Sequence, residues 1–264
     1  METAKQAVQG GASSFIVIPA RLASTRLPRK LLLRETGKTL IQHTYEAAAT
    51  ARRPSGLCVA TDHEDIFNAV RAFGGAVEMT SADCASGTDR VAEVARCSRL
   101  VGTGIDIVVN VQGDEPELPG SSIDAAIAVL EADPGVRIST LAAPIRKREQ
   151  LLDPSCVKVV FDASGRAMYF SRSPIPHARE WQDELLAREP PCFYQHIGLY
   201  AYRRDFLLEL AAIPASRLEQ LEKLEQLRFL EAGQAIAVAV VEKATPGIDT
   251  PHDYRAFVDR VLAR

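Results

Sequence analysis

The segment spanning residues 15–32 carries side chains suited to binding a phosphate group. It begins with an apolar run, residues 15–18, which is typical of a short strand buried on both faces. The loop that follows carries four cationic side chains among small residues: Arg21, Arg26, Arg29 and Lys30. Cations and free backbone N–H groups that converge on one anion-sized space favour a polyphosphate ligand. A solvated basic turn is the alternative that this segment leaves open.

Two common nucleotide-binding loops are excluded at this position. A Walker loop requires G-x-x-x-x-G-K-[ST], and a dinucleotide-binding fold requires G-x-G-x-x-G after its first strand. Neither pattern follows residues 15–18. The sequence therefore disfavours P-loop kinases and dinucleotide dehydrogenases.

A second candidate site follows the apolar run 105–111. Gln112, Asp114 and Glu115 come directly after it, at the end of a predicted strand where ligands bind in open α/β sheets. A carboxylate beside a triphosphate needs a cation between the two, and Mg²⁺ is commonly held by one or two carboxylates and phosphate oxygens. We therefore predict that Asp114 is a metal ligand. A turn in which Asp114 caps its own backbone is the alternative.

Apolar strands alternate with amphipathic helices along most of the chain. This alternation predicts an α/β fold in which a mostly parallel sheet is covered by helices on both sides. Antiparallel structure is expected in a hairpin formed by residues 157–162 and 166–170. A capping box at Ser216 opens a predicted leucine-rich helix that ends before Gly233. The other expected strands are 57–60, 77–79, 138–145 and 236–241.

Residues 171–196 do not follow the strand and helix pattern. They are rich in proline and charge, contain the single tryptophan and show no sustained period. A segment of this kind is usually a lid over a site or an arm at an interface. We predict a disordered tail at residues 1–14 and a single domain at 15–264.

Composition restricts the partners and the compartment. The chain has 264 residues, a net charge of −3 and a sequence pI near 6.0, so it has no general nucleic-acid footprint. It has no stretch of about 20 consecutive apolar residues, so no membrane span is expected. The five cysteines form no C-x-x-C pair and are odd in number, which favours reduced thiols in the cytoplasm.

Five motifs together resemble the 3-deoxy-manno-octulosonate (Kdo) cytidylyltransferases, a group of sugar nucleotidyltransferases. Their order is also that of the family, and the resemblance extends from residue 15 to the C-terminus. One departure lies in the first loop, where Arg29 and Leu31 stand in place of the commoner Gly and Pro. The motifs are P-A-R-x-x-S-T-R-L-P-x-K at 19–30, S-G-T-D-R at 86–90, V-N-V-Q-G-D-E-P at 109–116, H-I-G-L-Y at 196–200 and L-E-K-L-E-Q-L-R at 221–228.

The resemblance implies roles for individual residues. It implies nucleotide binding by Arg21, Ser24, Arg26, Lys30, Ser86 and Arg90. It implies sugar binding by Gln112, Arg172, His196, Glu225 and Gln226. Mg²⁺ would be held by Asp114 and Asp249, and the catalytic set would be Arg21, Arg26, Lys30, Asp114 and Asp249. From the residues alone, Asp249 would belong to the turn before a helix capped by Thr250, and exposed helix surface is the alternative for Glu225 and Gln226.

The resemblance also implies an activity. The fold would be the Rossmann-like nucleotide-diphospho-sugar transferase fold, with residues 157–202 as a sugar-side and dimerisation subregion of a homodimer. The reaction would be the transfer of CMP from CTP to Kdo, an acidic eight-carbon sugar, in lipopolysaccharide synthesis. Two alternatives remain: a cytidylyltransferase for another acidic ketose, such as 8-amino-Kdo or a sialic-acid-like sugar, and a non-catalytic nucleotide-sensing subunit.

Overall fold

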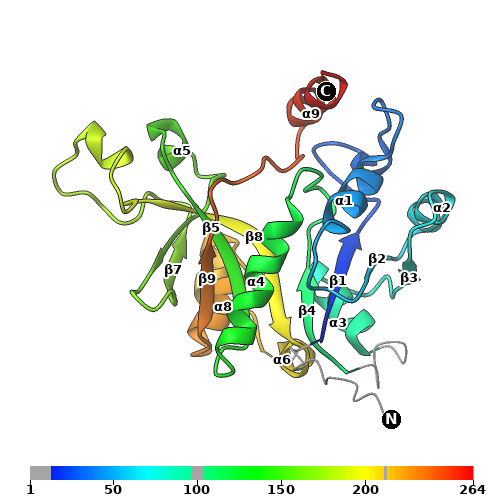
Figure 1. Ribbon diagram of the computed structural model, residues 1–264, viewed down its shortest axis with the longest axis horizontal. Helices are drawn as coiled ribbons and strands as arrows, with labels where there is room; N and C mark the ends of the chain where they lie inside the picture. The colour runs from blue at the N-terminus through cyan, green and yellow to red at the C-terminus, as the bar shows by residue number, and fades with distance from the viewer. Residues whose placement is uncertain (1–12, 97–103, 211–212, 264) are drawn as a thin grey trace, which may run out of the picture.

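A single sheet of nine strands organises the computed structural model, which describes residues 13–96, 104–210 and 213–263 (Figure 1). Its main path has the order β3-β2-β1-β4-β8-β5-β9. Every neighbouring pair along this path is parallel except the two pairs that β8 makes with β4 and β5. The strands are β1 (Ser13–Ala20), β2 (Leu57–Thr61), β3 (Val77–Met79), β4 (Ile105–Asn110), β5 (Ile138–Pro144), β8 (Tyr194–Arg203) and β9 (Ile236–Val240).

Helices cover both faces of the sheet, as the sequence predicted. Successive residues of β1 alternate between two hydrophobic clusters: Ile16 and Ile18 pack on one side, and Val17 packs on the other. The first cluster includes residues of α1 (Leu40–Ala48), α2 (Glu64–Ala72), α4 (Gly120–Ala132) and α9 (Pro251–Leu262). The second includes residues of α3 (Gly87–Arg96), α6 (Arg204–Leu210) and α8 (Gln226–Glu231). The mostly parallel α/β fold is therefore confirmed.

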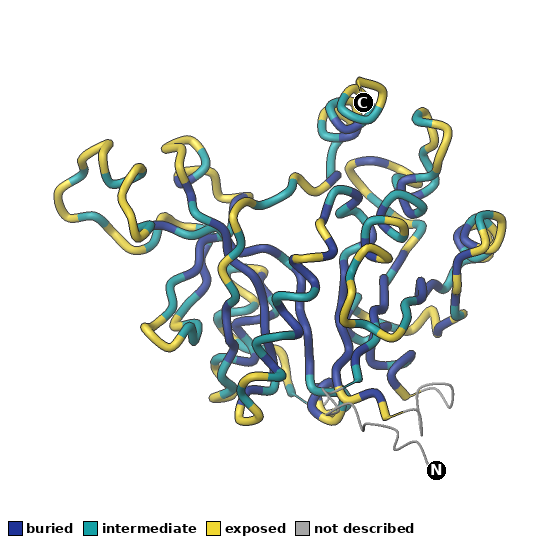
Figure 2. Tube along the Cα trace, in the orientation of Figure 1, coloured by how far each residue is buried: buried dark blue, intermediate teal, exposed yellow. Residues whose placement is uncertain are grey.

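Residues 171–196 were predicted to lie outside the strand and helix pattern, but the end of this segment belongs to the sheet. Residues 194–196 already belong to β8, and His196 pairs with Ala142 of β5. The hairpin of β6 (Lys158–Phe161) and β7 (Ala167–Ser171) is confirmed, and Lys158 joins it to β8 by pairing with Gln195. The segment between β7 and β8 reaches away from the body at the left of Figure 1 and is mostly exposed or half-buried in Figure 2. It contains the 3-10 helix η2 (Asp183–Leu186), and the sequence also missed α5 (Arg148–Leu152).

The predicted leucine-rich helix is broken into two, which corrects the sequence-based expectation. α7 (Arg217–Glu222) ends before Lys223, which has a left-handed φ of 53°, and α8 begins at Gln226. Leucines spaced three apart drift by about 60° per step around an α-helix, so one straight helix cannot bury them all. Leu221 is indeed 69% exposed, whereas Leu227 is fully buried.

The local capping signals are mostly confirmed. Ser216 and Thr250 each form a capping box, and Pro251 occupies the first turn of α9.

The predicted tail, residues 1–14, lies mainly outside the described residues. Its last two residues, Ser13 and Ser14, already belong to β1. Within the described parts of the chain, no helix combines the length and the apolar character needed to cross a membrane.

The start of α4 approaches the residues just after α1 closely enough to require glycine. A Cβ on Gly120 would lie 2.3 Å from the backbone nitrogen of Ala51 and 2.5 Å from the carbonyl carbon of Thr50. We expect Gly120→Ala to destabilise the protein by about 1–3 kcal/mol, because backbone atoms must move apart. Urea unfolding measures this change. Gly198→Ala is the matched control, because a Cβ there meets nothing within 4 Å; equal stability of the two variants would contradict the prediction.

Candidate active site

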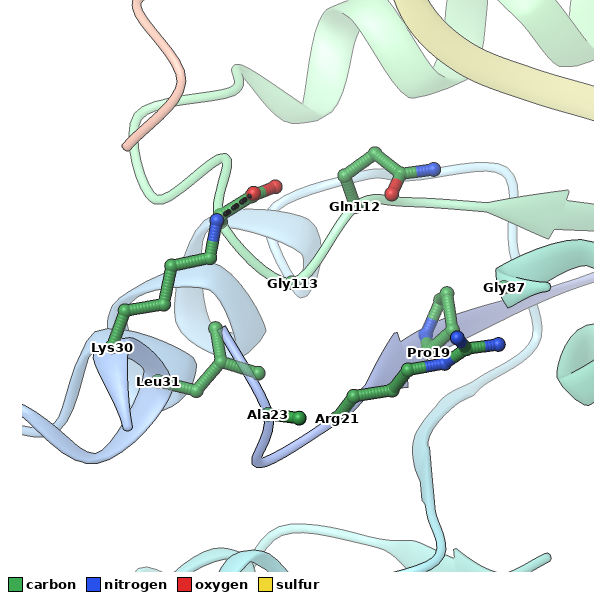
Figure 3. Close-up of a pocket in the computed structure, with 9 residues that line it drawn as sticks. Pro19, Arg21, Ala23, Lys30, Leu31, Gly87, Gln112 and Gly113 are labelled. Carbon is green, nitrogen blue, oxygen red and sulfur yellow. Dashed lines mark hydrogen bonds and ion pairs between the residues drawn. The ribbon is translucent and has the colours of Figure 1, made fainter. Parts of the chain in front are cut away.

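The two predicted phosphate and metal segments lie side by side because their strands are parallel neighbours. Val17 of β1 pairs with Asn110 of β4, so the loops after both strands leave the same edge of the sheet. A cavity of about 270 Å³ lies between them (Figure 3). Its lining residues are Pro19, Arg21, Ala23, Lys30, Leu31, Gly87, Gln112, Gly113 and Asp114.

The Lys30 ammonium is the centre of this cavity's charge arrangement (Figure 3). Its Nζ lies 2.5 Å from Asp114 Oδ2 and 3.1 Å from Asp249 Oδ1, and it donates to the Ile248 carbonyl at 3.0 Å. Burial lowers the pKa of Lys30, but the charges and hydrogen bonds of Asp114 and Asp249 outweigh that effect and raise it. Lys30 is therefore a protonated cation between two carboxylates. Arg26 Nη2 adds a second cation 3.0 Å from Asp249 Oδ2.

An unusual backbone conformation places Lys30. It begins the 3-10 helix η1 (Lys30–Leu32), and the preceding Arg29 has a left-handed φ of 55°. This is the position where the resembling family more commonly has glycine, which adopts that conformation without steric cost. In this chain the Arg29 guanidinium donates to Asp65 Oδ2 at 2.6 Å, and the buried Leu31 anchors the turn. Arg29 thus adopts the left-handed backbone conformation that glycine would adopt at this position.

Asp249 reaches Lys30 from the far end of the sequence. The following residue, Thr250, is the N-cap of α9, which leaves Asp249 outside the helix as predicted. The preceding Ile248 is fully buried, and its N–H donates to the Asp114 carbonyl at 2.9 Å. The two predicted metal ligands are therefore held together by a main-chain hydrogen bond as well as by Lys30.

A larger cavity, of about 570 Å³, adjoins Asp249. Arg26, Glu115, His196, Gly198 and Asp249 are among its lining residues. Burial, followed by the charge of Asp114, raises the pKa of Glu115 to about 8. Thr245 Oγ1 donates to Glu115 at 3.4 Å. The sequence placed Glu115 beside Asp114 in the second candidate site but gave it no role; only the fold shows that it faces a cavity.

His196 forms part of the wall of this second cavity, but its ring is held within the protein. Its Nε2 lies 2.9 Å from Thr140 Oγ1. The Thr140 hydroxyl is also 2.8 Å from the Leu199 carbonyl, to which it donates, so it accepts from His196. The His196 ring packs edge-on against Phe170, and burial lowers the pKa of His196 to about 3. His196 is therefore a neutral imidazole whose Nε2 is already engaged.

A third cavity, of about 560 Å³, brings Ser86 and Glu225 together. Ser86 Oγ accepts from the Asp89 N–H at 3.0 Å at the start of α3. Thr88 Oγ1 donates to Glu225 Oε2 at 2.8 Å, and burial raises the pKa of Glu225. The segment predicted to lie near the nucleotide and the helix predicted to contact the sugar therefore meet across this space.

Four of the predicted residues do not line these three cavities. Arg90 is fully buried; its guanidinium donates to Asp62 at 2.8 Å, and its Nε has no partner. Arg172 donates through Nε to the Glu222 carbonyl at 2.7 Å and through Nη1 to the Pro154 carbonyl at 3.0 Å. Through these hydrogen bonds, Arg90 and Arg172 hold neighbouring loops in place. The other two are the half-buried Ser24 and the buried Gln226.

Comparison with known proteins assigns the chain to a family. The cytidylyltransferase family model matches residues 15–236. A 3-deoxy-manno-octulosonate cytidylyltransferase of Rhodopirellula baltica is 53% identical over 248 residues, covering 94% of this chain and 98% of the relative. One from Geobacter sulfurreducens is 50% identical over 93% of this chain and 98% of the relative. The chain belongs to the 3-deoxy-manno-octulosonate cytidylyltransferase family.

Solved structures of cytidylyltransferases share the fold of this family member. A CMP:2-keto-3-deoxy-manno-octonic acid synthetase complexed with CTP superposes with a TM-score of 0.86 at 40% identity, covering 95% of this chain and 99% of that chain. A 4-diphosphocytidyl-2C-methyl-D-erythritol synthase from Anaerococcus prevotii superposes with a TM-score of 0.59 at 13% identity, over 96% and 97% of the two chains. The second likeness is one of fold alone.

Because His196 is neutral in the folded protein, it makes the free energy of unfolding depend on pH. Its pKa falls from 6.5 to about 3 on folding, so the unfolded state binds more protons between these values and stability is lost as the pH falls from about 6.5 toward 3. The slope from this group reaches about 1.4 kcal/mol per pH unit. We expect His196→Asn to remove this component in urea unfolding at pH 7.5, 6 and 5. A variant of the exposed His252 is the control, and a His196 variant that keeps the full wild-type slope would contradict the prediction.

Proposed function

We propose that this protein transfers CMP from CTP to Kdo and releases pyrophosphate. The observation that carries the proposal is the convergence of Arg21, Lys30 and Asp114 on one cavity at the carboxyl ends of β1 and β4. The names of the relatives and the CTP complex of the related synthetase support the choice of CTP and Kdo. Neither the geometry nor the relatives favour another acidic ketose or a non-catalytic subunit.

The chain's part in this reaction is positioning and charge stabilisation. The anomeric hydroxyl of the sugar forms the new bond to the α-phosphorus, the bond from that phosphorus to the bridging oxygen breaks, and pyrophosphate leaves in line. Such phosphoryl chemistry needs little covalent participation by the protein. Arg21, Arg26 and Lys30 would hold the triphosphate and stabilise the negative charge of the departing pyrophosphate.

The space between Asp114 and Asp249 suits a cation, because the Lys30 ammonium already occupies it with oxygen partners on both sides. The donors are carboxylate oxygens, which Mg²⁺ prefers. Among the described residues no cluster of three or more His, Cys, Asp or Glu is built to hold a metal, so further ligands would come from substrate oxygens and water. A bound Mg²⁺ would supply charge neutralisation and a lower pKa for the attacking hydroxyl.

The sugar would be oriented by residues around all three cavities. Gln112 lines the first cavity, His196 the second and Glu225 the third. Arg172 and Gln226 would complete this set, and Ser24, Ser86 and Arg90 would support the nucleotide. Dimerisation through residues 171–196, a cytoplasmic location and a role in lipopolysaccharide synthesis stay predictions.

We expect pyrophosphate release to require both CTP and Kdo, with UTP, ATP or GTP giving much less. Asp114→Asn should lower turnover by about 100-fold or more, because it removes one of two charges that balance the cations of the site. Asp106→Asn, on the exposed side of the same strand β4, is the matched control. Turnover near the wild-type rate in folded Asp114→Asn would contradict the role of Asp114, and no release with CTP and Kdo would contradict the function.

The Lys30 ammonium and a divalent ion compete for the same two carboxylates in the free protein. We therefore expect Lys30→Met to bind Mn²⁺, used as a probe for Mg²⁺, about tenfold more tightly than the wild-type protein does without CTP. Isothermal titration or the electron paramagnetic resonance of free Mn²⁺ measures this affinity without turnover. Lys38→Met, which removes an exposed ammonium paired with Glu46, is the control. Equal affinity of wild type and Lys30→Met would show that no competition exists.

A further inference from the structure

Lys158 is a fully buried lysine that none of the three cavities exposes. Its ammonium donates to the main-chain carbonyls of Asp153 at 2.9 Å, Cys156 at 2.6 Å and Arg172 at 2.5 Å. These three acceptors satisfy all three of its protons. Burial lowers the pKa of Lys158, since the charged form has lost water. A buried charge is a costly way to fill a core, so this lysine points to a role in holding the chain in one arrangement.

Glu222 holds the main chain of the same residue, Arg172, from the other direction. Its Oε2 accepts from the Arg172 N–H at 3.0 Å, and its Oε1 accepts from Ser171 Oγ at 2.7 Å. Its own carbonyl accepts from Arg172 Nε at 2.7 Å. Arg172 is therefore fixed at its carbonyl by Lys158 and at its N–H and side chain by Glu222.

The hydrogen bonds between Glu222 and Arg172 also fix the break between α7 and α8. Glu222 is the last residue of α7, and the left-handed Lys223 follows it directly. The chain then turns so that Glu225 faces the third cavity and Gln226, the first residue of α8, is buried. Hydrogen bonds thus link Lys158 of the β6–β7 hairpin to Arg172, and Arg172 to Glu222. From Glu222 the chain runs directly to Glu225 and Gln226 at the start of α8, the two residues that the proposed function assigns to the sugar.

We propose that Lys158 and Glu222 are positioning residues for the acceptor sugar. The inference rests on the proposed function, because it takes Glu225 and Gln226 to be on the sugar side. Neither Lys158 nor Glu222 lines the three cavities, so they act through Arg172 and the α7–α8 break. The nucleotide side is held mainly by other elements, namely the loops after β1 and β4, the turn before α9 and the start of α3, where Ser86 faces the third cavity.

The test is to measure the KM for Kdo and the KM for CTP separately in Lys158→Met and Glu222→Gln. Lys158→Met keeps the length of the side chain and removes its donors. Glu222→Gln keeps one oxygen for Ser171 but turns an amide N–H toward the N–H of Arg172. For both variants we expect the KM for Kdo to rise about tenfold or more, with the KM for CTP changing less than about twofold.

Controls separate positioning from a general loss of structure. Lys147→Met and Glu209→Gln remove an exposed charge of each sign and should leave both constants unchanged. Near-ultraviolet circular dichroism and thermal unfolding establish that each variant is folded. Glu222→Gln preserves the shape of its side chain, so it carries the test even where Lys158→Met does not fold.

The outcomes distinguish this inference from the proposed function. A selective rise in the KM for Kdo supports the positioning role. Equal changes in the two constants, or unchanged constants in folded variants, overturn it while leaving the proposed function in place. Wild-type protein that releases no pyrophosphate from CTP in the presence of Kdo overturns the proposed function and this inference with it.

Discussion

The site depends on one cation held between two carboxylates. Asp114 and Asp249 come from distant parts of the chain, and as like charges in a partly buried space they would repel each other without a positive group between them. The Lys30 ammonium supplies that charge and donates to the Ile248 carbonyl as well. The loop after β1, the loop after β4 and the turn before α9 therefore converge on a single side chain. The convergence creates the cavity that faces Arg21 and Gln112.

The basic residues in and around the site fall into an exposed group and a buried group. Arg21 and Arg26 lie at the surface, where a ligand can reach them. Arg90 and Lys158 are fully buried and bound to side chains or carbonyls of neighbouring loops. A buried charge is stable only when its partners are fixed. These two cations are therefore suited to holding loops in place and not to binding a substrate directly. The family motifs alone do not distinguish the buried Arg90 from the exposed Arg21 and Arg26.

Local signals in the sequence determined most of the elements. Apolar runs identified the parallel strands, since strands covered on both faces have no polar side to alternate. Capping residues such as Ser216 and Thr250 located helix starts because they satisfy N–H groups within one turn. The motif around Lys30, and the position of Asp114 after an apolar run, identified the edge of the sheet where the site lies.

Tertiary structure decided what depends on residues far apart in sequence. The antiparallel insertion of β8 between β4 and β5 follows from pairing across the sheet, to which residues 194–203 give no local signal. The break at Lys223 depends on the hydrogen bond between its neighbour Glu222 and Arg172, which lies far away in the sequence. The orientation of Glu115, the engaged ring of His196 and the buried guanidinium of Arg90 are likewise fixed by packing partners. A sequence names the groups that can do chemistry, but their burial and partners exist only once distant segments have packed together.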